Sequence, residues 1–307
     1  MKWKKLGRIF DTALLPEWAI SHAQVPTPIV LKDRVRVFFA ARNKNGKSFP
    51  IYADYDLNNL TKMIGFEQKP VLDLGDPGTF DDEGVMPAYA MHNGDNIWLY
   101  YSGWNQKIRT PYHNSTGIAV SKNGADFKRL YLGPIMDRTK EEPYLAVTPC
   151  IIQDGELWKM WYISGLKWVE IAGKYEPVYT IKYAESIDGI DWKRFPELPI
   201  KHHSEDEVFS HPSVVKISNR YHMWLCYRKI YDYRDGTNSY QIGYAHSDDG
   251  KNWLRNDELS GIEKSQEGWD SKMICYPYVI KIHSEYYMFY NGNYFGSTGF
   301  GLSILEK

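Results

Sequence analysis

Acidic residues recur at one place in the sequence, shortly before the proline of an apolar segment. These leads read FDDEGVMP, EEPYLAVTP, EDEVFSHP and GWDSKMICYP. Two carboxyl groups can share the work of an acid and a base, as they do when a glycosidic bond is hydrolysed. The candidates for the two catalytic roles are Glu142, Glu83, Asp82 and Asp270. Asp81 and Glu141, which directly precede Asp82 and Glu142, are expected to be solvated.

Other side chains near the same segments are candidates for substrate binding. An arginine can bind a carboxylate or a phosphate through two parallel hydrogen bonds, and aromatic rings can stack on the apolar faces of sugars. Arg42 and Arg228 could instead pair with the lead carboxylates, because a buried carboxylate usually needs a partner. The substrate-binding candidates are His22, Arg42, Trp104, Trp168, Glu207, His211, Arg228, Tyr276 and Asn293.

These segments belong to a unit that repeats along the chain. Each unit continues with an aromatic-rich strand such as WKMWYISG, a third strand such as YTIKYAES and a turn such as SIDGIDW, in which Asp-Gly is a hairpin signal. A long, regular period indicates a repeat architecture and argues against a β-sandwich. The units are 59 to 65 residues long, measured between the lead prolines Pro28, Pro87, Pro149, Pro212 and Pro277.

The repeat predicts an all-β fold, a single five-bladed β-propeller domain over residues 1–307. The last unit has no room for a fourth strand, so we expect residues 3–11 to supply it and to close the ring. In such a ring the leads and the ends of the second strands meet at one rim, which would bring the candidate residues together. The expected blades are approximately 20–65, 80–130, 140–195, 205–255 and 268–307.

The composition sets further limits on function. Lys and Arg number 37 against 38 Asp and Glu, a net charge of -1, so a nucleic-acid partner is not expected. No run of 18 apolar residues predicts a membrane span, and Asp11 and Pro16 interrupt the N-terminal apolar stretch of a secretory signal. Cys150, Cys226 and Cys275 read as buried thiols of a cytoplasmic protein. No ligand spacing predicts a metal, and no cofactor is predicted.

The motifs KMWYISG, IKYAESIDGIDWKR, IGYAHSDDGKNW and YYMFYNGNYFGSTGFGLSI together resemble the five-bladed β-propeller glycosidase superfamily, which includes glycoside hydrolase families 32, 43, 68, 117 and 130. The resemblance spans about residues 15–305. More narrowly, the chain is similar to bacterial glycosidase-like proteins that are often encoded together with surface-polysaccharide biosynthesis. It implies an acidic residue at the start of each of the first three blades: Asp82 or Glu83 in blade two, and Glu142 as proton donor in blade three. The first lead, SHAQVP, departs from the pattern because it has no acidic residue.

Three functions follow from these observations. The leading hypothesis is a glycoside hydrolase in which Glu142 protonates the leaving oxygen while a second lead carboxylate activates water. The alternative is a glycoside phosphorylase or transglycosylase on the same scaffold, and the third is a carbohydrate-binding propeller without catalysis. Each of these three hypotheses predicts a small carbohydrate or oligosaccharide as the partner. In a phosphorylase the basic side chains that could hold phosphate are Arg42, Arg228, Lys167, Lys272 and His211.

Overall fold

The computed structural model describes residues 1–234 and 236–306, and its regular secondary structure is almost entirely β-strand, as predicted. Segments such as WKMWYISG and HMWLCYR form long strands because aromatic and β-branched residues suit a half-buried pleated surface. Side-chain hydrogen bonds shape the Ser-x-Asp-Gly turns: Ser247 Oγ accepts from Gly250 N at 2.8 Å, and Asp249 Oδ1 accepts from Lys251 N at 2.7 Å. None of the described helices is long and apolar enough to cross a membrane.

The strands form antiparallel groups that follow one another along the chain. The first two groups are β2 (Ala19–Val30), β3 (Arg34–Asn43), β4 (Ser48–Asp56) and β5 (Asn59–Phe66), then β6 (Gly84–Asn93), β7 (Asn96–Gln106), β8 (Tyr112–Ser121) and β9 (Lys128–Arg129). The next two are β10 (Ala146–Asp154), β11 (Leu157–Ile171), β12 (Lys174–Ser186) and β13 (Lys193–Arg194), then β14 (Glu207–Ile217), β15 (Arg220–Lys229), β16 (Gln241–Ser247) and β17 (Leu254–Arg255).

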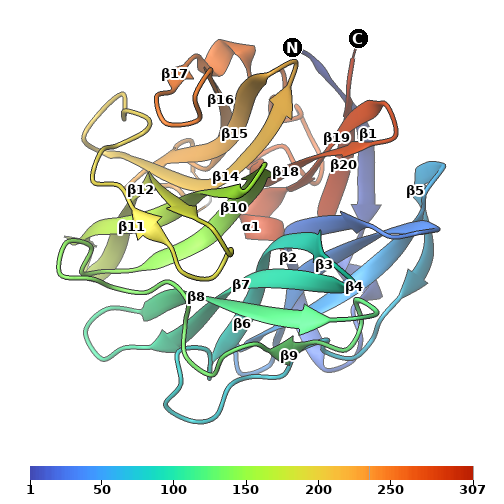
Figure 1. Ribbon diagram of the computed structural model, residues 1–307, viewed down its shortest axis with the longest axis horizontal. Helices are drawn as coiled ribbons and strands as arrows, with labels where there is room; N and C mark the ends of the chain where they lie inside the picture. The colour runs from blue at the N-terminus through green and yellow to red at the C-terminus, as the bar shows by residue number, and fades with distance from the viewer. Residues whose placement is uncertain (235, 307) are drawn as a thin grey trace.

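The last group combines both ends of the sequence. It contains β18 (Cys275–Ile282), β19 (Glu285–Asn291), β20 (Phe300–Leu305) and β1 (Trp3–Phe10), and the helical turn α1 (Asn293–Gly296) joins β19 to β20. Strand β1 is antiparallel to β20, with Trp3 opposite Leu305 and Phe10 opposite Phe300. The two termini therefore lie near each other (Figure 1). Short 3₁₀ turns lie at Thr12–Leu14 and Asp257–Leu259.

The first strands of the groups converge in the middle of the molecule (Figure 1). They contact one another in the order β2, β6, β10, β14 and β18, and β18 contacts β2. Neighbouring groups pack through large aromatic side chains: the ring centre of Trp161 lies 5.9 Å from that of Tyr221 and 5.8 Å from that of Trp253. Burying each such ring stabilises the fold by about 1.5–3 kcal/mol.

Each first strand is irregular beside its lead proline. The pairing register shifts there in β10, β14 and β18, and the residues before the prolines, Thr148, His211 and Tyr276, have φ values of 51°, 46° and 53°. Residues other than glycine rarely adopt this left-handed backbone conformation, and backbone strain of this kind concentrates at functional sites. The bulges occur where the first strands meet, so they control which side chains face the centre.

Candidate functional site

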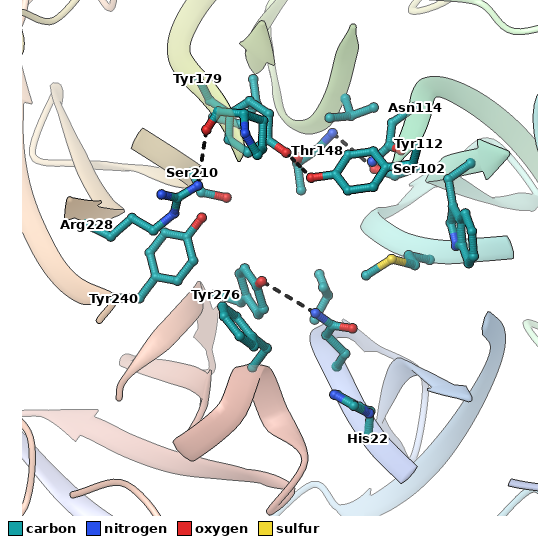
Figure 2. A pocket seen from close by; sticks show the side chains of 18 of the residues that line it. His22, Ser102, Tyr112, Asn114, Thr148, Tyr179, Ser210, Arg228, Tyr240 and Tyr276 are labelled. Carbon is teal, nitrogen blue, oxygen red and sulfur yellow. Dashed lines mark hydrogen bonds between the residues drawn. The ribbon is translucent and has the colours of Figure 1, made fainter. Parts of the chain in front are cut away.

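A cavity of about 340 Å³ lies where the first strands converge, and Figure 2 shows side chains surrounding it from several groups. This volume is at the small end of ligand-binding pockets. Aromatic rings with polar groups between them suit a ligand that has both apolar faces and polar edges. The aromatic members of the wall are Trp104, Tyr112, Tyr179, Tyr233, Tyr240, Tyr276 and Phe295.

Arg228, near the end of β15, lies in the cavity wall and is only 3% exposed. Its guanidinium lies 3.6 Å from the centre of the Tyr233 ring, and it donates to the backbone oxygens of Lys229 at 2.8 Å and Pro177 at 3.2 Å. These acceptors are neutral, and the Nε atom has no hydrogen-bond partner among the described residues. The side chain is therefore fixed in place, while no described carboxylate serves as its counter-ion.

Arg42, near the end of β3, lines the same cavity. Its Nη2 donates to Gln24 Oε1 at 3.1 Å, and Gln24 Nε2 donates to the Tyr276 hydroxyl at 3.4 Å. The Nε of Arg42 is also without a partner in the described part of the chain. Burial lowers the pKa of Arg42, as expected for a cation that has no anionic neighbour, although a guanidinium stays charged at neutral pH.

The cavity wall carries a net positive charge. Arg234 also lines it, and across residues 1–234 and 236–306 the lining contains no carboxylate. The carboxylate of Glu176, only 7% exposed, lies outside the lining, where it accepts from Arg234 Nη2 at 2.9 and 3.0 Å and from the Tyr233 hydroxyl. Glu176 therefore balances Arg234, while no carboxylate of residues 1–234 or 236–306 pairs with Arg42 or Arg228. An anionic group is the ligand that such a wall attracts.

Neutral donors and rings complete the wall. The hydroxyls of Tyr112 and Tyr179 meet across neighbouring groups (Figure 2), and burial raises the pKa of Tyr112 to about 12, so that it stays protonated at neutral pH. The indole Nε1 of Trp104 donates to Ser48 Oγ at 2.8 Å, which fixes the ring in the wall. These groups could bind sugar hydroxyls and a sugar face.

His22 faces the cavity from β2. It has a φ of 66° within a register shift of the β2–β3 pair, and its Nδ1 lies 2.8 Å from Ser21 Oγ. Burial and, to a smaller extent, the charge of Arg42 lower the pKa of His22 to about 4. The imidazole is therefore neutral at physiological pH.

The cavity brings together five of the predicted substrate-binding residues, His22, Arg42, Trp104, Arg228 and Tyr276, and leaves out the other four. Two of these four lie behind wall residues. The Trp168 ring packs on Tyr112 with 5.3 Å between ring centres, and the His211 ring packs on Tyr276 with 5.7 Å.

The remaining two are held by structural hydrogen bonds. Arg255 donates to both carboxylate oxygens of Glu207, at 2.7 and 2.9 Å. Asn293 Oδ1 accepts from the backbone N of Lys272 at 2.7 Å and of Met273 at 3.1 Å. Neither side chain lines the cavity. Lys167 lies elsewhere, in an open groove between neighbouring groups.

The four predicted catalytic carboxylates do not line the cavity. Glu142 accepts from the hydroxyls of Tyr162 and Ser164, each at 2.9 Å, and from Arg194 at 3.2 Å. Asp270 accepts from Tyr290 at 3.0 Å and from Lys5 at 2.6 Å. In addition, Asp82 Oδ2 accepts from Gly78 N at 2.7 Å, and Glu83 pairs with Lys47 at 3.1 Å.

A repeated structural contact explains why acidic leads recur. In three groups, a buried lead acid accepts from a tyrosine 20 residues later and from a basic side chain of the outermost strand. Asp81 takes this position in the second group: it is 0% exposed and accepts from Tyr101 at 3.0 Å and from Arg129 at 2.8 Å. The expectation that Asp81 is solvated is therefore wrong, whereas Glu141 is exposed as predicted.

Sequence reasoning missed several wall residues. Tyr179 and Tyr240 each stand two residues before an isoleucine in the motif Tyr-x-Ile-x-Tyr-Ala, and this repetition could have identified them. Gln24 lies in the first lead, SHAQVP, which has no acidic residue, and it lines the wall together with His22. Sequence reasoning also missed Glu176, which lies outside the lining and pairs with Arg234. It carries no comparable signal, because it lies in the part of the β11–β12 hairpin that extends beyond the repeat.

The three cysteines lie in the interior of the protein. Cys150, Cys226 and Cys275 are buried and unpaired, as predicted. Within the described ranges, no cluster of three or more His, Cys, Asp or Glu side chains could hold a metal ion.

Comparison with known proteins first identifies relatives of similar length. No protein-family model matches the chain. Two proteins of Mycobacterium tuberculosis, MT1551 of strain CDC 1551 / Oshkosh and Rv1502 of strain ATCC 25618 / H37Rv, are each 36% identical to it over 309 residues, which covers 100% of the chain and of each relative. Both are described as uncharacterized proteins.

Solved structures share the fold at much lower identity. A structure described as "Glycoside hydrolase" has a TM-score of 0.76 at 19% identity, covering 99% of this chain and 93% of its own. A complex of BT0996 with RGII has a TM-score of 0.75 at 18% identity, covering 99% and 91%. A thermostable family-43 glycoside hydrolase has a TM-score of 0.70 at 18% identity, covering 96% and 92%. At these identities the similarity establishes the fold alone.

Proposed function

We propose a glycosidase-like function on an anionic carbohydrate for this chain, which belongs to one protein family with MT1551 and Rv1502 and has the fold of the propeller glycosidases. One observation carries the proposal: the partly buried Arg42 and the buried Arg228 line one aromatic cavity, and neither forms an ion pair with any residue of 1–234 or 236–306. A buried cation without a partner destabilises a fold. Its presence beside a cavity is therefore best explained by an anion that binds there.

The anionic group and the sugar ring of the proposed ligand each have matching side chains in the cavity wall. Its carboxylate or phosphate group would lie against Arg42 and Arg228, whose guanidiniums are fixed by Gln24 and by backbone oxygens. Its sugar ring would lie against Trp104, and neutral tyrosine hydroxyls would donate to its oxygens. The size of the cavity favours a small carbohydrate.

The lack of lining carboxylates favours a second candidate, a glycoside phosphorylase. Inorganic phosphate would occupy the anionic subsite and attack the sugar carbon, so that no protein nucleophile is required. In a carbohydrate-binding propeller, by contrast, the same wall would bind ligand without turnover. A direct catalytic role for Glu142 and the other lead carboxylates is a separate proposal, which the Glu142 variant in the Discussion tests.

We also propose that the strand groups are five blades of one closed propeller domain. The cyclic contacts of the first strands and the pairing of β1 with β20 support this arrangement. In such a ring every blade contributes side chains to the central cavity, as the lining residues from β2, β6, β10, β14 and β18 do.

Thermal unfolding with added ligands tests the anionic subsite. Glucuronate and inorganic phosphate should raise the Tm of the wild type, and glucose at the same concentration should raise it much less. The double variant Arg42→Met/Arg228→Met should lose the anion response, whereas Arg220→Met, which removes an exposed charge elsewhere, should keep it. An equal response of the double variant and the wild type would refute the proposal.

Turnover assays then separate the candidate functions. Aryl glycosides of uronic acids and of neutral sugars are incubated with and without phosphate. Free sugar as the product indicates hydrolysis, and a sugar phosphate indicates phosphorolysis. Binding without any turnover indicates a carbohydrate-binding propeller.

A further inference from the structure

His22 and Arg42 form a pair on neighbouring strands at the edge of the cavity. Ser21 lies opposite Arg42 in the β2–β3 register, and the shift between Ser21 and Gln24 brings His22 into the wall. Figure 2 shows His22 on β2, near the cavity. The left-handed backbone at His22, with φ of 66°, is unusual for a side chain of this size, and strain of this kind persists where surrounding contacts enforce a function.

The two ring nitrogens of His22 have different surroundings. Nδ1 is 2.8 Å from Ser21 Oγ, whereas no hydrogen bond within the described residues occupies Nε2. When Nδ1 donates its hydrogen to Ser21 Oγ, the free electron pair lies on Nε2. In this tautomer Nε2 is the atom at which the imidazole takes up a proton.

We propose that an anion bound at Arg42 causes His22 to take up a proton at Nε2, so that the occupied cavity holds a proton donor that the empty cavity lacks. This inference rests on the proposed function, because it requires an anion in the cavity. The wall has no carboxylic acid within the described ranges, and His22 would supply the missing acid.

The electrostatics of the site support this coupling. Burial is the main reason why the pKa of His22 is about 4, and the positive charge of Arg42 lowers it further. From β18 and β8, Tyr276 and Tyr112 interact with Arg42, and burial keeps both phenols neutral by raising their pKa. An anion at Arg42 would cancel its repulsion and attract the imidazolium, and both effects raise the pKa of His22.

The proton can then serve bond cleavage. As the bond between the sugar carbon and the leaving oxygen breaks, the proton passes from Nε2 to that oxygen, and His22 becomes neutral again. Water adds its oxygen to the sugar carbon and releases one proton to solvent. Atoms and charge balance, and no redox partner is required.

Calorimetry with sulfate tests the proposal, because sulfate does not titrate between pH 4 and 7. Sulfate is titrated into the wild type at pH 5.5 in two buffers of different ionisation enthalpy. We expect net proton uptake on binding, tighter binding at lower pH, and loss of the uptake in His22→Gln. The control His222→Gln removes a histidine whose pKa burial also lowers but which contacts Tyr244 away from the cavity, and it should leave the uptake unchanged.

Imidazole nitrogen NMR of the wild type provides a readout that does not depend on a variant folding. Saturating sulfate should raise the pKa of His22 by about one unit or more and leave that of His222 unchanged. Sulfate binding without proton uptake, or uptake that persists in His22→Gln, would overturn this inference and leave the anionic subsite intact. Failure of the wild type to bind sulfate, glucuronate or phosphate would overturn both proposals.

Discussion

The contrast between paired and unpaired arginines is the main feature at the scale of single residues. The Arg255 side chain is buried and Arg42 is partly buried, but Arg255 donates to Glu207 and Asp257 at 2.6–3.0 Å, whereas Arg42 donates to the neutral Gln24. Arg234 in the cavity wall likewise donates to a carboxylate, that of Glu176, whereas Arg42 and Arg228 form no ion pair with any described residue. The missing counter-ion, rather than the arginine itself, distinguishes a candidate binding residue from a structural one.

Replacing the two arginines should therefore change stability in opposite directions. Arg42→Met removes a partly buried charge that has no ion-pair partner among the described residues, and it should raise the free energy of unfolding by about 1 kcal/mol. Arg255→Met leaves buried carboxylates unpaired and should lower the free energy of unfolding by about 3–5 kcal/mol. Urea unfolding without ligand measures both. Destabilisation of Arg42→Met to the same extent as Arg255→Met would contradict an unpaired charge at Arg42.

The Glu142→Gln variant tests whether this lead acid is structural. It should lower the free energy of unfolding by about 2–4 kcal/mol, because Arg194 loses its buried carboxylate partner. Its anion-induced Tm shift should match that of the wild type. Unchanged stability combined with complete loss of turnover would instead indicate the direct catalytic role that the family resemblance implies.

The buried histidines predict a pH dependence of stability. The folded-state pKa values of His22, about 4, and His211, about 3, lie below the value near 6.5 of an unfolded chain. Between pH 6.5 and about 4 the unfolded chain binds more protons, so stability falls as the pH falls through this window. His211 alone should account for about 2 kcal/mol at pH 5.

Urea unfolding at pH 7 and pH 5 measures this loss of stability. The difference between the two pH values should be smaller in His211→Gln than in the wild type. An equal difference in both proteins would exclude His211 as its source.

At the scale of elements, the lead prolines mark where first strands stop being regular. The bulges beside them turn Thr148 and Tyr276 into the cavity wall, while His211 stays behind Tyr276. An extra residue at a bulge re-aims the side chains next to it. The site is therefore made by irregular positions of a regular scaffold.

Strand β1 is the element whose removal is most informative. It pairs with β20 and supplies Lys5, which donates to Asp270 at 2.6 Å. Deleting residues 1–10 should lower the free energy of unfolding by several kcal/mol, because it removes a sheet edge and the buried rings of Trp3 and Phe10. An unchanged melting temperature of the truncated chain would disprove the closing role of β1.

At the scale of the whole molecule, each group depends on its neighbours. The first strands contact one another in a cycle, and aromatic side chains fill the space between adjacent groups. No single group can bury both of its faces alone, so we expect the groups to fold as one unit.

This dependence predicts one unfolding transition. Tryptophan fluorescence and far-ultraviolet circular dichroism should give coincident curves in urea, and the transition should move to higher urea as a whole when glucuronate is added. Two separated transitions would show that part of the chain folds on its own.

Hydrophobic period and turn signals are local properties of the chain, so the strand-rich repeat, its lead prolines and five of the residues that line the cavity could be predicted from the sequence. The sequence by itself did not determine which repeated residues face the centre. Glu142, Asp270 and Asp81 recur because every group needs the same buried contact, and recurrence alone cannot separate that need from catalysis. The packed fold separates the two, because among the described residues Arg42 and Arg228 have no ion-pair partner while the lead acids Glu142, Asp270 and Asp81 have theirs.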